Sequence, residues 1–200
     1  MFDVALRRLV DPALIRVGGW IAHRRISANM LTISGAGLAL GAAFFVTQSN
    51  FTAALGFILL NRILDGLDGV VARINGTTEF GGYLDTVCDY IFYISIPLTF
   101  GFIAPFNHMP ALLLVASFTL TAVSFLAFAA IAARRGRDDG VHGPKALIYS
   151  TGLMEGAETI SFFVLFCLFP SFFPTLAIIF ATLCLITVVQ RLILAAKSFD

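Results

Sequence analysis

The sequence is poor in charged residues. Only 12% of its 200 residues are Asp, Glu, Lys or Arg, whereas a soluble domain carries roughly 25%. Hydrophobic residues make up 58% of the chain. This balance excludes a soluble globular domain and predicts an integral membrane protein. The net charge is +1 and no long basic run occurs, so we expect membrane lipids and no nucleic acid among its partners.

Cysteine is also scarce. The three cysteines, Cys88, Cys167 and Cys184, lie in apolar stretches and follow no metal-binding spacing. We therefore expect them to be small buried hydrophobic residues.

Long apolar stretches recur along the chain, and each is near the roughly 20 residues that a helix needs to cross a bilayer. They predict an all-α protein of one domain, residues 1–200, in which 28–197 form a bundle of six transmembrane helices. The expected helices are about 28–48, 51–74, 81–104, 109–134, 147–168 and 172–196. Ser27 is placed to cap the first helix, and Pro105 and Pro170 mark two of the turns.

Residues 1–25 have a different pattern. Apolar residues recur at three- and four-residue steps from Leu6 to Ile21, and Arg7, Arg8 and Arg16 occupy the other face. This pattern predicts an amphipathic helix that lies in the membrane interface. A helix packed on the rest of the protein is the alternative.

The basic residues fall on one side of the predicted membrane, with the exception of Arg62, which is expected deeper in the bilayer. They lie before the first helix, after the second, between the fourth and fifth, and near the end of the chain: Arg24, Arg25, Arg73, Arg134, Arg135, Arg137, Lys145, Arg191 and Lys197. The opposite turns, near Ser49, Asn107 and Ser171, hold no Lys or Arg. The positive-inside rule therefore predicts a multi-pass protein of the plasma (inner) membrane with both termini in the cytoplasm.

Four aspartates interrupt the apolar pattern between residues 61 and 91. Asp65 and Asp68 are three residues apart, and Asp85 and Asp89 are four apart, so each pair shares one face of a helix. A turn rich in Gly, Asn and Thr separates the pairs, and a helical hairpin would bring them face to face. Four carboxylates repel one another unless they are compensated, and one or two divalent cations would do this. Arg62, three residues before Asp65, is expected to pair with an acid or a polar neighbour.

Neighbouring residues suit a phosphate-bearing substrate. Gly69 would let a substrate approach the backbone, Arg73 would grip a phosphate, and Thr78 would donate a hydroxyl. A carboxylate at the edge of the cluster would take the proton from an attacking alcohol.

The complete pattern is Asp65-x-x-Asp68-Gly69-x-x-Ala72-Arg73 followed by Gly81-x-x-x-Asp85-x-x-x-Asp89. It resembles the signature of the class I CDP-alcohol phosphatidyltransferases, and all eight signature positions are filled. The family's six membrane helices also fit a chain of this length.

The resemblance implies a role for each position. Asp65, Asp68, Asp85 and Asp89 would hold Mg²⁺, or Mn²⁺, and Asp89 would also be the general base. The residues that would contact the CDP moiety are Ser27, Ala28, Asn29, Met30, Gly69, Arg73 and Thr78. The implied reaction moves a phosphatidyl group from a CDP-alcohol, such as CDP-diacylglycerol, to a small acceptor alcohol and releases CMP, in phospholipid biosynthesis. The resemblance also implies a homodimer.

Two other functions are compatible with intramembrane acids. One is a catalytically silent membrane protein with a structural or transport-related divalent-cation site. The other is an isoprenyl transferase, but that class needs more helices and has a different motif.

The acceptor pocket is expected near the fifth helix. Glu155 and Glu158 share a helical face, with Lys145 before them and Arg191 on the last helix. The two glutamates either line an acceptor pocket or pair with Arg62 or Arg191. Because they would repel a phosphate, we expect a neutral or cationic acceptor. Arg134, Arg135 and Arg191 would instead favour an anion.

Overall fold

A computed structural model describes residues 2–138, 154 and 156–199, with the side chains of residues 2–9 and 136–138 left aside. All of its regular structure is helical. Within these residues the α-helices are α1 (Phe2–His23), α2 (Ala28–Thr47), α3 (Phe51–Asn75), α4 (Glu79–Ile103), α5 (His108–Asp138), α7 (Gly156–Leu168) and α8 (Phe173–Phe199). Short 3₁₀ turns, Pro105–Asn107 and Pro170–Phe172, begin at the prolines that the sequence marks as turns.

Four segments are long and apolar enough to cross a membrane: Ala28–Thr47, Glu79–Ile103, Pro105–Arg135 and Pro170–Phe199. The protein is therefore a multi-span membrane protein. Helix α3 is also long, at 25 residues, but Arg62, Asp65 and Asp68 interrupt its apolar sequence. The expected fifth span, 147–168, is described only as the 13 residues of α7, because its beginning lies outside the described residues. Six spans remain a prediction.

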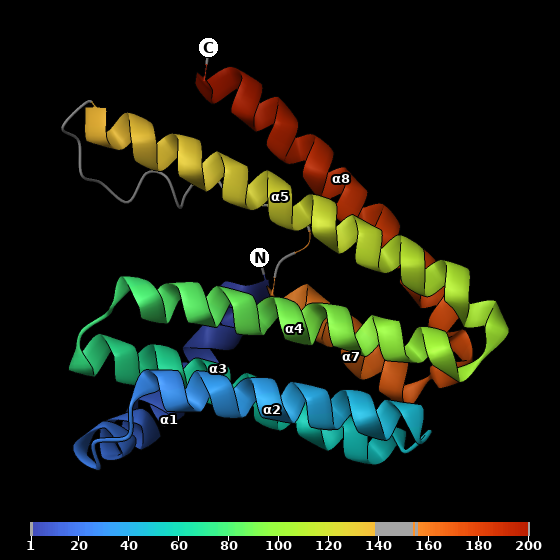
Figure 1. The fold of residues 1–200 in the computed structure, drawn as a ribbon, viewed down its shortest axis with the longest axis horizontal. Helices are drawn as coiled ribbons and strands as arrows, with labels where there is room; N and C mark the ends of the chain where they lie inside the picture. Colours follow the sequence, from blue (N-terminus) through green and yellow to red (C-terminus); the bar gives the residue numbers. More distant parts are fainter. Residues whose placement is uncertain (1, 139–153, 155, 200) are drawn as a thin grey trace.

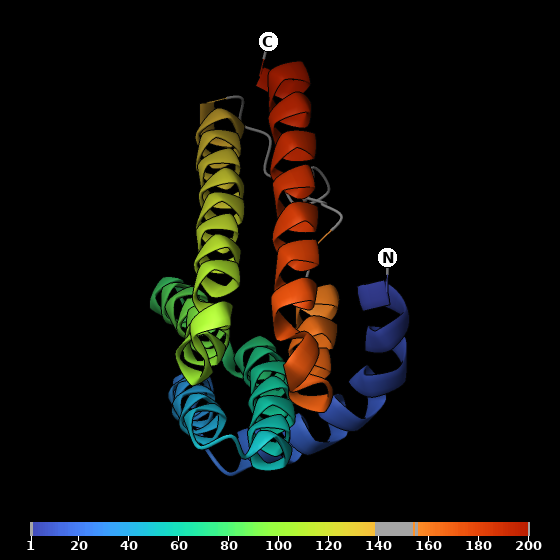
Figure 2. The same cartoon turned by 90° about the vertical axis from the view of Figure 1, so that its right-hand side faces the viewer.

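The helices form two groups that open away from each other (Figure 1). Helix α2 packs on α3 and α4, and α5 packs on α8. The groups meet where α4 turns into α5, and they separate toward the end where α4 begins (Figures 1 and 2). The backbones of the two groups are therefore farthest apart at the end of the bundle that carries the α3–α4 turn.

Phenylalanine fills the closed end of the bundle. Phe92 and Phe100 of α4 are fully buried, and Phe100 stacks on Phe173 of α8 with ring centroids 4.9 Å apart. Phe163 of α7 packs edge-on against Phe92 at 5.3 Å. Packing of this kind is worth about 0.5–1.5 kcal/mol per aromatic pair beyond area burial. It holds the two groups together at one end, and the described helices of the two groups diverge toward the other end.

Helix α1 packs against α3 through close contacts at glycine. A Cβ atom on Gly18 would lie 2.5 Å from Val70 Cγ1, and one on Gly66 would lie 2.7 Å from Leu14 Cδ1. On the outer face Val17 and Trp20 are exposed. Packing on the protein, the alternative to the interfacial helix, is thus present, and the apolar outer face stays compatible with a membrane interface.

Candidate metal centre

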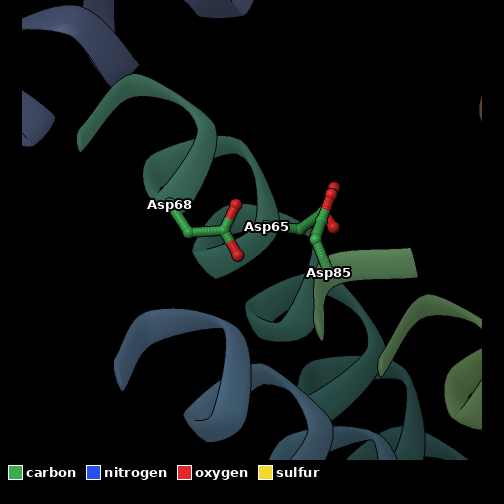
Figure 3. Close-up of side chains that lie close together, drawn as sticks. All are labelled: Asp65, Asp68 and Asp85. Atoms are coloured by element: carbon green, nitrogen blue, oxygen red, sulfur yellow. The ribbon is translucent and has the colours of Figure 1, made fainter. Parts of the chain in front are cut away.

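Three of the four aspartates gather at one point. Asp65 and Asp68 lie on α3 and Asp85 on α4, and each offers a ligand oxygen within 4.8 Å of the others (Figure 3). A hard divalent cation binds carboxylate oxygens at about 2.0–2.6 Å, which places two ligands of one ion at most about 5 Å apart. The spacing and the chemistry of these oxygens therefore fit one Mg²⁺ or Mn²⁺ ion, which the cluster could hold.

Asp68 is the most enclosed member of the cluster. It is 6% exposed, and its Oδ2 accepts a 2.7 Å hydrogen bond from Thr32 Oγ1 on α2. The backbone oxygen of Ala28 also lies 3.0 Å from Thr32 Oγ1, so the single hydroxyl proton lies between these two acceptors. Thr32 was not among the residues expected at the site. Its only signal in the sequence is a polar residue one turn into a mostly apolar helix.

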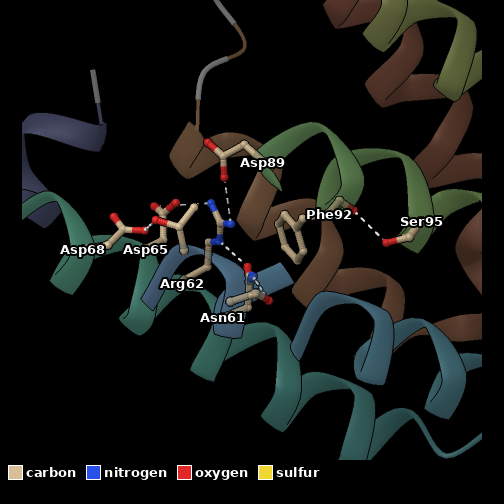
Figure 4. A network of polar contacts seen from close by, with 9 residues as sticks. Asn61, Arg62, Asp65, Asp68, Asp89, Phe92 and Ser95 are labelled. Carbon is tan, nitrogen blue, oxygen red and sulfur yellow. Dashed lines mark hydrogen bonds and ion pairs between the residues drawn. The ribbon is translucent and has the colours of Figure 1, made fainter. Parts of the chain in front are cut away.

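Asp89 lies one turn further along α4 and does not join the three-carboxylate group. Its Oδ1 accepts a hydrogen bond from an Arg62 terminal nitrogen at 3.0 Å (Figure 4). The other terminal nitrogen lies 3.5 Å from Asp65 Oδ2. The expectation that Arg62 pairs with an acid is thus confirmed. The metal roles expected for all four aspartates stay a prediction, and the structure brings three of them together.

Arg62 also has a polar neighbour that the sequence did not single out. Its Nε donates to Asn61 Oδ1 at 2.7 Å, and Asn61 Nδ2 donates to the backbone oxygen of Gly35 at 2.8 Å. The guanidinium stacks on the Phe92 ring, 4.2 Å from its centroid. Helices α2, α3 and α4 are therefore connected through the neighbouring side chains of Asn61 and Arg62.

A cavity of about 370 Å³ opens beside the cluster, between the start of α2, the end of α3 and the α3–α4 turn. Its lining contains six of the seven residues expected to contact CDP: Ser27, Ala28, Asn29, Gly69, Arg73 and Thr78. The seventh, Met30, has an exposed side chain, and its backbone N–H donates to the Ser27 hydroxyl at 3.2 Å. Ser27 and Thr78 are also the N-caps of α2 and α4, and this fixes both helix starts at the cavity.

A second cavity, of about 480 Å³, lies on the other side of the cluster where the two helix groups separate. Its lining includes Asp85, Asp89, Tyr90, Thr121 and Arg191. Asp85 lines both cavities. The cluster is therefore open to two compartments, one on each side.

Of the residues expected around the acceptor, Arg191 lines this second cavity. It is 8% exposed and donates to the backbone oxygen of Thr121 at 3.0 Å. Glu158 is half-buried in the first turn of α7 and is not among the described residues that line the cavity. Lys145 and Glu155 lie outside the described residues.

The fold and the aspartate pattern together define a class. The family model described as CDP-alcohol phosphatidyltransferase matches residues 25–195. The chain therefore belongs to the CDP-alcohol phosphatidyltransferase family.

Particular relatives differ in how much of the chain they share. The Inner membrane protein YnjF of Escherichia coli strain K12 is 40% identical over 194 residues, which cover 96% of this chain and 93% of YnjF. The archaetidylinositol phosphate synthase of Pyrococcus horikoshii is 36% identical over 93 residues, 46% of this chain and 49% of that protein.

Among solved structures, the phosphatidylinositol phosphate synthase PgsA1 of Mycobacterium tuberculosis has the same fold. Its complex with manganese and citrate aligns with a TM-score of 0.69 at 19% identity, covering 92% of this chain and 89% of PgsA1. Its CDP-DAG complex aligns with a TM-score of 0.62 at 21% identity, covering 90% and 91%. A relative of this fold thus binds manganese and CDP-DAG.

Proposed function

We propose that the protein transfers a phosphatidyl (phospho-alcohol) group from a CDP-alcohol such as CDP-diacylglycerol to an acceptor alcohol, releasing CMP, in phospholipid biosynthesis. The observation that carries this proposal is the position of Asp85, which belongs to the three-carboxylate cluster and lines both cavities. A donor in one cavity and an acceptor in the other would meet at the cluster. Family membership and the CDP-DAG bound to PgsA1 support the same reaction.

The donor side is the cavity of about 370 Å³. Arg73 places a permanent positive charge there, suited to a pyrophosphate, and Gly69 leaves the α3 backbone accessible. The hydroxyls of Ser27 and Thr78, which accept the capping hydrogen bonds, keep their own protons to donate to the nucleotide.

Asp65, Asp68 and Asp85 would hold the cation, Mg²⁺ in the cell with Mn²⁺ as a substitute. When bound, the cation neutralises the pyrophosphate and stabilises charge on the transferring phosphoryl oxygens. The bond from phosphorus to the CMP oxygen breaks as the acceptor oxygen bonds to that phosphorus. We assign the acceptor's proton to Asp89, which lines the second cavity and stands outside the three-carboxylate group.

The acceptor would enter through the cavity of about 480 Å³. Asp85 and Asp89 disfavour an anionic alcohol there, which supports a neutral or cationic acceptor. Arg191 in the same lining is the group that would favour a phosphorylated one. The assay of acceptor alcohols therefore compares neutral, cationic and phosphorylated alcohols.

We place the reaction at the inner leaflet of the inner membrane, with six spans, both termini in the cytoplasm and two chains per assembly. The distribution of basic residues supports this orientation. The relative YnjF is named an inner membrane protein, which supports the assignment to the inner membrane.

The test is CMP release by the full chain in liposomes supplied with CDP-diacylglycerol, Mg²⁺ and a panel of alcohols. The panel holds a neutral polyol, choline, serine, glycerol phosphate and inositol phosphate. Release with one of them supports the transferase. Turnover of the phosphorylated alcohols alone would overturn the acceptor class but not the reaction.

A catalytically silent cation-binding protein remains the second candidate. The pairing of Arg62 with Asp65 and Asp89 favours it, because a structural ion cluster would be compensated in this way. Retained Mn²⁺ binding without CMP release from any CDP-alcohol would select this alternative.

A further inference from the structure

The guanidinium of Arg62 is fixed on four sides. Its Nε donates to Asn61 at 2.7 Å, and its terminal nitrogens lie 3.0 Å from Asp89 and 3.5 Å from Asp65. The ring of Phe92 lies against its face. The side chain is only 12% exposed. Because the guanidinium is planar and all three of its nitrogens have partners, the Arg62 side chain is held in one orientation. A lysine ammonium, which is compact and sits on a flexible side chain, would not be fixed in this way.

The support beneath Arg62 is equally rigid. Asn61 is 3% exposed, and its amide is tied to the backbone of Gly35 on α2. Both functional ends of the Asn61 amide are therefore used, one by α2 and one by Arg62. A turn of the Asp89 carboxylate toward the cluster would therefore cost its hydrogen bond to the guanidinium.

Asp89 lies beside the cluster, and Arg62 donates a hydrogen bond to it. It lines the same small space, of about 10 Å³, as Asp65, Asp68 and Asp85. It also shares a face of α4 with Asp85, four residues earlier. Yet its oxygen is bound to Arg62 and is not among the three that gather within 4.8 Å.

We propose that Arg62 is a positioning residue that holds Asp89 out of the cation centre. The substrate-free protein then binds its divalent cation through Asp65, Asp68 and Asp85, and Asp89 stays directed to the second cavity. This inference rests on the proposed function, because it assigns Asp89 to the acceptor and the other three to the metal. Position 62 is not part of the aspartate signature.

Two simpler roles for Arg62 make different predictions. As a mere positive charge, it would weaken cation binding by repulsion whether or not Asp89 is a carboxylate. As a mere packing residue between α3 and α4, it would change thermal stability but not cation affinity. The proposed role alone makes the effect of Arg62 depend on Asp89.

The experiment is a Mn²⁺ titration of the purified full chain in detergent, with free Mn²⁺ followed by electron paramagnetic resonance. Wild type is compared with Arg62→Met, Asp89→Asn and the double variant, and Asp85→Asn is the matched control on the same helix face. We expect Arg62→Met to tighten Mn²⁺ binding about tenfold, because Asp89 becomes an additional charged ligand. Asp89→Asn alone should stay within about twofold of wild type. The double variant should gain much less affinity over Asp89→Asn than Arg62→Met gains over wild type, because no carboxylate is left to release and only the charge of Arg62 beside Asp65 has been removed. Asp85→Asn should weaken binding about tenfold or more.

Three results would overturn the proposal. If Arg62→Met tightened Mn²⁺ binding equally with and without the Asp89 carboxylate, charge repulsion alone would explain the effect of Arg62. Unchanged affinity in Arg62→Met would leave only packing. Loss of affinity in Asp89→Asn would show that Asp89 is already a ligand, and this variant decides even if Arg62→Met does not fold. The CMP assay is independent: the expected Mn²⁺ pattern without CMP release would overturn the transferase and keep the role of Arg62.

Discussion

Thr32 on α2 donates a 2.7 Å hydrogen bond to the carboxylate of Asp68 on α3. The bond crosses between two helices and fixes the orientation of the most buried cluster aspartate. Loss of a group that orients a metal ligand from outside the coordination shell typically lowers metal affinity or activity about 10–100-fold.

Thr32→Val keeps the shape of the side chain and removes the hydroxyl. We expect Mn²⁺ binding to weaken about tenfold, because Asp68 loses the donor that orients it. Thr119→Val is the matched control, since Thr119 is exposed and donates only to its own helix backbone. Equal Mn²⁺ affinities in the two variants would remove Thr32 from the site.

The CDP side can be tested at Gly81. A Cβ atom there would lie 2.9 Å from Thr78 Oγ1 and 3.2 Å from Asn29 Oδ1, so both must move. Gly81→Ala should therefore raise KM for CDP-diacylglycerol about tenfold or more, because small displacements of binding groups are costly. Gly37→Ala adds a methyl group to open space on α2 and should leave KM unchanged. If Gly81→Ala also keeps its KM, the nucleotide does not occupy this cavity.

The joint between the two helix groups can be tested at Gly101. A Cβ atom there would lie 2.8 Å from the Cβ of Ala111, across the turn from α4 to α5. Gly101→Val should lower stability by about 1–3 kcal/mol, as overpacking does in tightly packed cores. Thermal unfolding in detergent measures this loss, and Gly56→Val, which meets open space, is the comparison. Equal unfolding midpoints would show that the close approach is not structurally required.

Local features of the fold were predictable where one segment decides them. Ser27 was expected to cap the first helix, and it does so through its bond from Met30. The second helix was expected over 51–74 and is Phe51–Asn75. These features depend on residues within one turn of each other. The six expected spans stay a prediction, because charged residues interrupt the apolar sequence of α3 and the beginning of the expected fifth helix lies outside the described residues.

The site was predictable in outline and less so in detail. Spacing alone places Asp65 and Asp68 on one helix face and Asp85 on the next, and the structure joins them. Spacing does not reveal which acid Arg62 binds. Asp65 is three residues from Arg62 in the sequence, whereas Asp89 is 27 residues away. Only the packing of α3 on α4 brings Asp89 near Arg62. Thr32 acts across helices in the same way, so its role too depends on tertiary packing.

The central claim is that a cation held by the aspartate cluster serves both cavities, and Asp85 tests it most directly because it lines both of them. The measurement is CMP release from CDP-diacylglycerol by Asp85→Asn at saturating Mg²⁺, with the exposed Asp11→Asn as the control. The account predicts that wild type and Asp11→Asn release CMP, that chelation of Mg²⁺ stops this release, and that Asp85→Asn is slower by about a hundredfold or more. CMP release by Asp85→Asn within about threefold of wild type would contradict it.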